Sequence, residues 1–469
     1  MRAVLALVML AGFFVLAVAL TGGLTALAVW RFSLGDVEGG AWLLVVAVAL
    51  GGPALWASLL AVFARPRPSG FRMSREEHPE LWRHVEELAR LAGTRGPDDV
   101  RLVDGANASV WERRGVRYLE LGLPLVAGLG VGELRSVLAH ELGHYGGGHT
   151  RIASATYRAK LALELSLRGD RMFGLLSAWA HLYALVAASE SRDHERFADE
   201  VAVAAAGRDA ARRALLRIGP VGEAWGDYLV HYVSLAVAAG RTPPLLAGFR
   251  AYLDHPRRVH ALRSLERVLA DREPASVFDS HPPIRDRVAA MASLGGGDVP
   301  VDERPGWTLL SRVPPEAVSS LLGVGGPAAT WDEVVALSGP AHVRRYAEAL
   351  RHAGRVSRVG ERLTDVLAAL GRGELLKLTG APVDASATPE EVHEAAVETV
   401  TELLANAVAH ELVSSGRASL ELNWGGMFVL RLADGAAVHP EPLVEPAVRD
   451  PAHVPGVRSR LSALGVDGL

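Results

Sequence analysis

The stretch HELGHYGGGHT, from His140 to Thr150, contains three histidines and one glutamate. His140 and His144 are four positions apart, which is about one turn of an α-helix, so their imidazoles project from the same face. This spacing can hold two corners of a tetrahedral Zn²⁺ site, and Glu141 beside them can take a proton from a water molecule. The pattern predicts a zinc-dependent hydrolase, unless the pair is a chance arrangement on a helix.

The third metal ligand distinguishes the kinds of metalloprotease that use such a helix. In the pattern HExxHxxGxxH the third histidine falls at position 150, which is Thr150 here, and His149 is one residue short. An intramembrane protease would place the helix itself in the bilayer, but Glu133, Arg135 and Ser136 make it too polar for lipid. The remaining possibility is a glutamate on a second helix further along the chain.

The segment SESRDHERFADEVA, Ser189 to Ala202, offers such a glutamate. Glu195 and Asp199 are one helical turn apart and share a face. Glu195 can therefore reach the metal while Asp199 accepts the N–H of a ligand histidine and fixes its tautomer. The alternative is a solvated, charged helix face, because the segment also contains several other charged side chains.

The elements that must position these residues follow from the hydrophobic pattern. Apolar residues at helical spacing predict a helix that begins near Val131 and ends in Gly146 to Gly148. Before it, the runs DVRLVDG, ASVWE and VRYLEL are typical of short strands, and RRG between the last two predicts a turn. We therefore expect a mostly α fold with a small antiparallel β-sheet ahead of the histidine helix.

Composition narrows the chemistry and the partners. The chain has no cysteine, which excludes thiolate metal sites, disulfides and cysteine nucleophiles. Its formal net charge is −4 and it has no basic cluster, so nucleic acid is not an expected partner. Its hydrophobic fraction of 49% is high for a wholly soluble protein, which favours a lipid bilayer as a partner.

Two uncharged runs near the N-terminus, Ala3–Trp30 and Ala41–Ala64, are 28 and 24 residues long. About 20 apolar residues cross a bilayer core, so we expect residues 1–66 to form a transmembrane helix hairpin rather than a cleaved signal peptide. Arginines flank the hairpin at Arg2 and from Arg65 onward, and the positive-inside rule then places both ends in the cytoplasm. The predicted location is the cell membrane, with a cytoplasmic catalytic domain.

Three motifs in order, HELGH, SRDHERFAD and SHPPIRDR at Ser280 to Arg287, resemble those of the HtpX-like membrane zinc metallopeptidases. These enzymes are relatives of the CAAX prenyl proteases and of the Oma-type proteases. The resemblance covers roughly residues 1–295. It implies a zincin-like peptidase domain that needs Zn²⁺ and acts on proteins or peptides.

The resemblance also implies a role for each site residue. The implied zinc ligands are His140, His144 and Glu195. Glu141 would be the general base, and Asp199 would support a ligand histidine from behind. His281 and Arg287 would lie at the cleft and stabilise the oxyanion; alternatively, His281 only ends a loop and Arg287 forms a structural ion pair. The substrate would pair as an extended strand with the sheet edge near Asn107.

The implied function is a membrane-anchored zinc metalloendopeptidase in membrane protein quality control. Two alternatives come from other classes: a membrane signal transducer with a regulated protease domain, as in BlaR-type receptors, and a non-catalytic membrane scaffold. Related enzymes often carry a second transmembrane hairpin after the histidine helix. Because Ile152–Leu167 contains charged residues, we expect residues 152–189 to form a core or membrane-surface helix pair and not a second transmembrane hairpin.

The end of the resemblance near residue 295 predicts three regions. These are the hairpin 1–66, a peptidase domain 67–295 and a soluble C-terminal domain 296–469. In the last region we expect helices followed by a β-hairpin over ASLELNWGGMFVLRLADG, with a docking or regulatory role. The segment VAHELVSS imitates the zinc helix, but Ser414 replaces the second histidine, so we expect no metal there.

Overall fold

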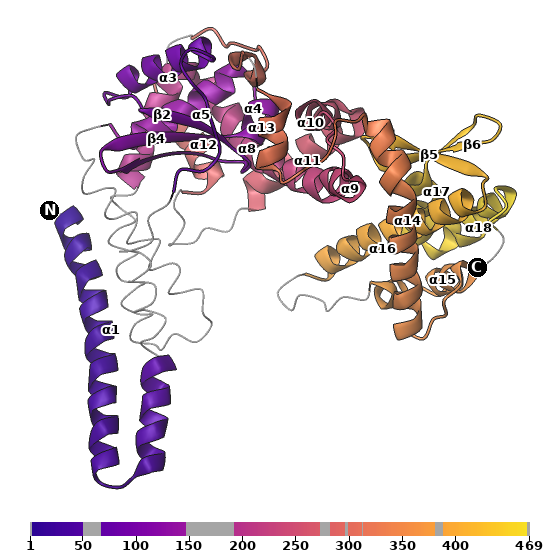
Figure 1. The fold of residues 1–469 in the computed structure, drawn as a ribbon, viewed down its shortest axis with the longest axis horizontal. Helices are drawn as coiled ribbons and strands as arrows, with labels where there is room; N and C mark the ends of the chain where they lie inside the picture. The colour runs from indigo at the N-terminus through magenta and orange to yellow at the C-terminus, as the bar shows by residue number, and fades with distance from the viewer. Residues whose placement is uncertain are drawn as a thin grey trace. The chain divides into compact units, whose positions relative to one another are not determined.

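The computed structural model divides the chain into two compact units, each built from two stretches of sequence (Figure 1). The first unit comprises Met1–Glu223 and Leu262–Val313, and the second comprises Ala224–Ala261 and Pro314–Leu469. The structure describes residues 2–49, 67–146, 192–272, 282–295, 299–311, 313–379 and 388–466. The predictions for residues 152–189, for His149 and for His281 fall outside these ranges.

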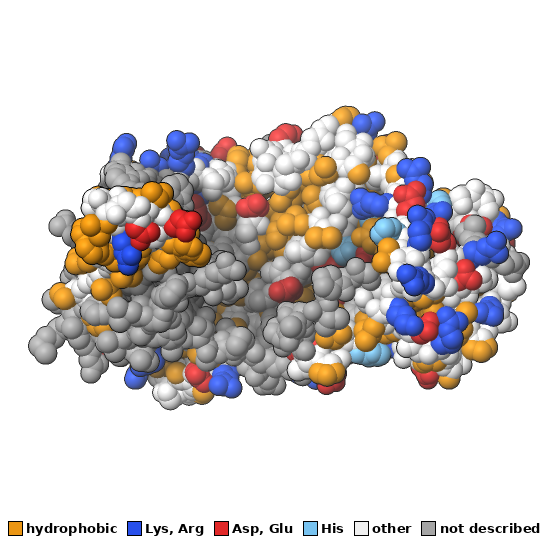
Figure 2. Space-filling view, turned by 90° about the horizontal axis from the view of Figure 1, so that it is seen from below, with side chains coloured by type: hydrophobic (Ala, Val, Ile, Leu, Met, Phe, Trp, Pro, Cys, Tyr) orange, Lys and Arg blue, Asp and Glu red, His pale blue; other side chains and the backbone are white. Residues whose placement is uncertain are grey.

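The N-terminal segment of the first unit is a pair of helices. α1 spans Arg2–Ser33, and after a turn a second helix spans residues 37–49. Figure 2 shows hydrophobic side chains around a few charged ones at the turn of this pair. None of the helices that the structure describes has the length and hydropathy of a membrane span. The rest of the second predicted span, residues 50–66, is not described.

The sheet of the first unit has the strand order β1-β2-β4-β3. The strands are β1 (Phe71–Arg72), β2 (Asp99–Val103), β3 (Ala108–Arg113) and β4 (Val116–Gly122). β3 and β4 form the predicted hairpin, and its turn residues Arg114 and Gly115 both have positive φ, as a tight two-residue hairpin requires.

The sheet is mixed, so the prediction of a purely antiparallel sheet is wrong. β2 runs parallel to β4. The physical reason lies in the loop after β2, where the chain reverses and leaves one strand position open beside β2. The hairpin reverses the chain once more and fills that position with β4, which therefore points the same way as β2. The hairpin also leaves β3 at the edge of the sheet.

Helices surround this sheet and supply most of the core of the first unit (Figure 1). They are α3 (Pro79–Leu91), α4 (Leu123–Gly128), α5 (Val131–Gly143), a helix over residues 192–206, α12 (Ile284–Ala292) and the 3₁₀ helix η2 (Gly306–Leu309). α8 (Arg208–Tyr228) and α11 (Pro256–Arg272) each contain a boundary between the units. α5 begins at the predicted residue, and it is buried on nearly all sides.

The second unit is mainly helical and carries a small antiparallel sheet, β5-β6-β7. Its strands are β5 (Ala418–Asn423), β6 (Met427–Leu432) and β7 (Ala437–Val438). Its helices are η1 (Leu229–Val233), α9 (Ser234–Ala239), α10 (Leu245–Asp254), α13 (Pro315–Leu321), α14 (Trp331–Val356), α15 (Leu363–Gly371), η3 (Leu375–Leu378), α16 (Pro389–Ser414), α17 (Pro440–Arg449), η4 (Pro451–His453) and α18 (Val454–Ala463). The predicted C-terminal hairpin is confirmed as β5 and β6, and it is followed by β7, α17, η4 and α18.

An aromatic core joins the two stretches of the second unit. Tyr228 and Tyr232 come from the first stretch, whereas Trp331 and Trp424 come from the second. The ring centroids of Tyr232 and Trp424 lie 5.0 Å apart, and those of Trp331 and Trp424 lie 5.4 Å apart. Such aromatic contacts contribute strongly to a core, so residues 224–261 fold together with the C-terminal stretch.

Candidate metal centre

α5 carries both histidines of the predicted zinc pair. His140 is buried within the helix, and His144 directly follows its last residue with backbone angles that are still helical (φ −60°, ψ −17°). The one-turn spacing is therefore kept at the end of the helix, and the two Nε2 atoms lie 3.2 Å apart. Both imidazoles can thus direct a nitrogen to the same ion.

The third predicted ligand comes from the helix over residues 192–206. This helix packs against α5 at Gly143, where a Cβ atom would lie 2.9 Å from the Cα of Ala198, so the contact requires glycine. The close approach brings Glu195, which is 4% exposed, to the histidines. Its two carboxylate oxygens lie 3.7 and 3.5 Å from the Nε2 atoms of the first and second histidine.

These three side chains fit a zinc ion. In a tetrahedral site with bonds of 2.0–2.1 Å, neighbouring ligand atoms are roughly 3.3 Å apart. Here the two Nε2 atoms are 3.2 Å apart, Oε1 of Glu195 lies 3.5 Å from Nε2 of His144, and Oε2 of Glu195 lies 3.7 Å from Nε2 of His140, so the carboxylate faces both imidazoles at similar distances. Two imidazoles and one carboxylate also form a donor set that catalytic zinc accepts while keeping a fourth position open. Within the described ranges, this is the one His/Cys/Asp/Glu group with ligand atoms close enough for a metal ion.

A second buried carboxylate lies next to the Nδ1 atom of His140. Asp199 is 4% exposed, and its Oδ1 lies 3.1 Å from Nδ1 of His140. Arg287 on α12 donates from Nε to Asp199 Oδ2 at 3.1 Å and from Nη2 to Oδ1 at 2.6 Å. Burial alone would raise the pKa of Asp199, but the hydrogen bonds from His140 and Arg287 lower it to about 2. An ionised Asp199 can hold the Nδ1 hydrogen of His140, which leaves Nε2 for a metal.

The remaining predicted site residues lie in two places. Glu141 follows the first ligand on α5 and is half-buried. Asn107 directly precedes the edge strand β3, and its carbonyl oxygen accepts a hydrogen bond from Gly122 N at 2.8 Å. β3 pairs with β4 alone among the described strands, so no described strand pairs with its other edge. His281 lies outside the described residues.

A comparison with protein families identifies the segment that carries this centre. Residues 75–294 match the sequence model of peptidase family M48, and the three ligands lie within the match. This segment is an M48 peptidase domain. Neither the curated proteins nor the solved structures contain a match to the chain.

The M48 match and the ligand geometry together make the chain a zinc metalloendopeptidase. The prediction of Zn²⁺ as the cofactor is confirmed, because the family is zinc-dependent and the chain has a His–His–Glu group able to hold the ion. Protein or peptide substrates follow from the peptidase class.

One network around the M48 centre was missed from the sequence. Glu133 is 3% exposed and accepts a hydrogen bond from the backbone N–H of Gly130 at 2.8 Å. It also forms an ion pair with Arg217 at 3.0 Å. A glutamate at the third position of a helix that starts after a glycine is a local sign of a helix N-terminus. No local sign marks Arg217, which lies 84 residues further along the chain.

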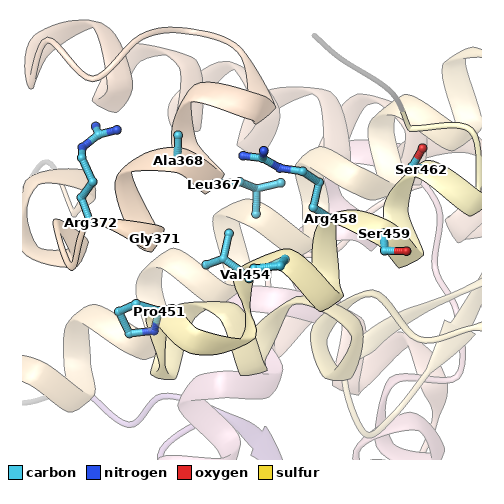
Figure 3. A pocket seen from close by; sticks show the side chains of 10 residues that line it. Leu367, Ala368, Gly371, Arg372, Pro451, Val454, Arg458, Ser459 and Ser462 are labelled. Carbon is cyan, nitrogen blue, oxygen red and sulfur yellow. The ribbon is translucent and has the colours of Figure 1, made fainter.

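A groove of about 670 Å³ is lined by residues of the second unit, all of which lie outside the segment that matches family M48. α15 and α18 provide most of its lining, and Arg372 and Arg458 flank an apolar floor that includes Leu367 and Val454 (Figure 3). Its lining contains no histidine, aspartate or glutamate. The groove therefore offers no metal-binding chemistry of the kind found in the M48 domain.

Proposed function

We propose that this protein is a membrane-anchored, HtpX-like zinc metalloendopeptidase that cleaves membrane proteins or misfolded membrane-associated proteins. The observation that carries the proposal is the convergence of His140, His144 and Glu195 on one point, with Glu141 next to the first ligand. The motif resemblance and the M48 match support the substrate class.

Glu141 is the general base in this proposal. It takes a proton from the water that attacks the scissile carbonyl and passes this proton to the leaving amine. Zinc, when bound, supplies a Lewis acid that acidifies water and polarises the carbonyl. The partial exposure of Glu141, beside a buried His140, suits a side chain that must meet a substrate.

Asp199 and Arg287 act through His140 in the proposed mechanism. Asp199 orients the imidazole, and Arg287 keeps Asp199 ionised inside the protein. Arg287 Nη2 donates to Asp199 Oδ1 at 2.6 Å, closer than it lies to either ring nitrogen of His140, which are 3.2 Å (Nδ1) and 3.4 Å (Nε2) away. This placement supports the ion-pair alternative for Arg287 and leaves His281 as the proposed donor to the oxyanion.

The edge strand β3 is the proposed binding element for the substrate. An extended peptide can add to a free strand edge through backbone hydrogen bonds, with specificity from alternate side-chain pockets. β3 contacts α5, the helix that carries the histidines. We therefore propose that the substrate chain enters beside Asn107 and lies along β3 across the metal centre.

The proposed membrane anchor is the N-terminal helix pair. Its support is the sequence, with two uncharged runs long enough to cross a bilayer, and the exposure of large apolar side chains such as Val18, Val29 and Trp42. The flanking arginines support a multi-pass protein in the cell membrane with both ends of the pair in the cytoplasm. The catalytic domain would then also lie in the cytoplasm.

The test compares zinc content and casein cleavage in detergent-purified protein. Glu195→Ala removes the third ligand, and Glu200→Ala on the same helix is the matched control because Glu200 is exposed. We expect near-stoichiometric zinc in wild type and control, and loss of both zinc and cleavage in Glu195→Ala. Removal of zinc with a chelator should abolish wild-type cleavage, and added zinc should restore it.

Two results would contradict the proposal. Unchanged zinc content in Glu195→Ala would mean that the third ligand lies elsewhere. Bound zinc without cleavage of any protein would favour a signalling or scaffold role over an endopeptidase. The membrane anchor is tested separately, by extraction of the full chain from membranes with alkaline carbonate, which releases proteins that do not cross the bilayer.

A further inference from the structure

The first turn of the zinc helix α5 is capped by backbone from a distant segment. The first amides of a helix have no partner within the helix, and the N-cap residue here is a glycine without a capping side chain. Val131 N instead donates to Arg304 O at 2.8 Å, and Gly132 N donates to Asp302 O at 2.9 Å. We call the segment that provides these carbonyls, residues 299–311, the strap.

The strap also bonds to the backbone just before α5. Gly306 N donates to Leu129 O at 2.8 Å, and Pro305 forms a β-bridge with Gly130. Leu309 of the strap is 1% exposed, so its side chain belongs to the core of the first unit. The strap is therefore an integral part of this unit, with backbone hydrogen bonds running in both directions.

The strap and α5 approach each other closely at two glycines, one on the helix and one on the strap. A Cβ on Gly132 would lie 3.1 Å from Val301 Cγ1 and 3.3 Å from Asp302 O. A Cβ on Gly306 would lie 2.7 Å from Leu129 O and would also meet the side chain of Leu134. An alanine at Gly306 would therefore force the strap and the helix to shift, and an alanine at Gly132 would press on Val301 and on the backbone of the strap.

Charged residues reinforce the same junction. Glu133, in the first turn of α5, is paired with Arg217 at 3.0 Å and with Arg213 at 3.4 Å. Arg213 also pairs with Glu303 of the strap at 2.9 Å. Arginines of α8 thus link the buried carboxylate of Glu133 to the strap, and this network fixes the position of the strap relative to the zinc helix.

The strap lies beyond the segment that matches family M48. The match ends at residue 294, and the strap provides its capping carbonyls at positions 302 and 304. The second stretch of the second unit begins at Pro314, a few positions along the chain from the strap. The residues that complete the zinc helix are therefore part of the connection to the C-terminal region.

We propose that the strap is a positioning element of the metal centre, and that the functional peptidase extends to about residue 311. His140 lies in the last turn of α5 and His144 directly follows it, so a tilt at the capped end of α5 changes how the two imidazoles meet Glu195 on a different helix. This inference rests on the proposed zinc ligands. It states that the strap keeps these ligands in the geometry that binds zinc.

The test uses the full-length protein and four variants. Gly132→Ala and Gly306→Ala disturb the junction, and Gly295→Ala is the matched control because nothing lies within 4 Å of its Cβ position. The double variant Gly132→Ala/Val301→Ala removes the nearest obstructing atom. The readouts are the zinc dissociation constant from competition with a chelator, the urea midpoint of the zinc-free protein, and kcat and KM on a peptide.

We expect Gly132→Ala and Gly306→Ala to raise the zinc dissociation constant about fivefold or more, with a fall in kcat. Alanine normally favours a helix over glycine, so a loss in Gly132→Ala reports on the strap and not on helix propensity. The control should match wild type, and the double variant should recover most of the zinc affinity, because the two sites are in contact.

The inference is overturned if the junction variants lower only the urea midpoint while the zinc affinity and kcat of the folded protein stay at the wild-type level. It is also overturned if Gly295→Ala has the same effect as Gly132→Ala. A wild-type protein that binds no zinc is a different outcome, because it would overturn the proposed function itself and this inference with it.

Discussion

In the proposed mechanism Glu141 is the general base, and the two histidines beside it hold the metal. Glutamine in place of Glu141 keeps the shape of the side chain and removes the base. We therefore expect kcat of Glu141→Gln to fall on the order of 10²–10⁴-fold, the usual contribution of a general base. Zinc content should stay at the wild-type level, since Glu141 is not one of the three ligands. Peptide turnover and metal analysis on the same sample check both, and near-normal turnover would exclude Glu141 as the base.

Arg287 forms an ion pair with the buried carboxylate of Asp199, so removing the arginine leaves that charge unpaired. Arg287→Ala leaves Asp199, which is 4% exposed, without its ion-pair partner. We expect a loss of about 3–5 kcal/mol in the free energy of unfolding, the usual effect of breaking a buried pair, together with weaker zinc binding. Urea unfolding and chelator competition measure these. A variant with wild-type stability and zinc affinity but low kcat would instead show direct oxyanion stabilisation.

At the scale of elements, the edge of β3 that no described strand pairs with makes a prediction about substrate binding. Residues of an antiparallel pair alternate between hydrogen-bonded and non-hydrogen-bonded positions, and the two-residue turn makes Arg113 and Val116 a bonded pair. By this alternation the N–H of Val110 points away from β4. Val110→Pro should therefore leave the hairpin ladder intact and remove one donor to the substrate. We expect a higher KM on a protein substrate with unchanged zinc content.

The control for this strand is Val110→Ala. Val110 has a buried side chain, and alanine loses the same packing while it keeps the backbone N–H. The difference in KM between the proline and alanine variants thus isolates the hydrogen bond to the substrate. Equal KM values for the two variants would remove β3 as the binding element.

At the scale of the whole molecule, the second unit contains a buried histidine that makes stability depend on pH. His342 on α14 is 5% exposed, and burial together with the charge of Arg345 lowers its pKa from 6.5 to about 4. Below pH 6.5 the imidazole of His342 is protonated in the unfolded chain, whereas in the folded chain it stays mostly neutral until the pH falls to about 4. The contribution to stability is therefore complete above about pH 7 and is lost as the pH falls toward 4.

We expect this histidine to account for about 2 kcal/mol of the stability lost between pH 7 and pH 5. His342→Phe removes the titration while it keeps a ring beside Tyr346 and Phe428, the two ring partners of His342. Urea unfolding at both pH values should show a smaller difference for this variant than for wild type. His352→Phe, at an exposed position of the same helix, is the control. A variant with the wild-type pH dependence would disprove the assignment.

The sequence alone determined the zinc chemistry of this protein. A pair of histidines one turn apart is a local pattern, since the helical repeat itself puts both side chains on one face. Glu195 and Asp199 are also one turn apart, so their shared face was predictable as well. The start of α5, the β3–β4 hairpin and the C-terminal hairpin were predictable for the same reason, because each depends on neighbouring residues.

Only the tertiary structure decided what depends on residues far apart in the chain. The parallel pairing of β2 with β4, the contact of Gly143 with Ala198 and the capping of α5 by the strap are of this kind. The contact of the Arg287 guanidinium with a carboxylate 88 residues away is another example, and it supports the proposed ion-pair role of Arg287. Periodicity and spacing show which face of an element is apolar or polar. The partner of that face is set by packing of the whole chain, which no local pattern contains.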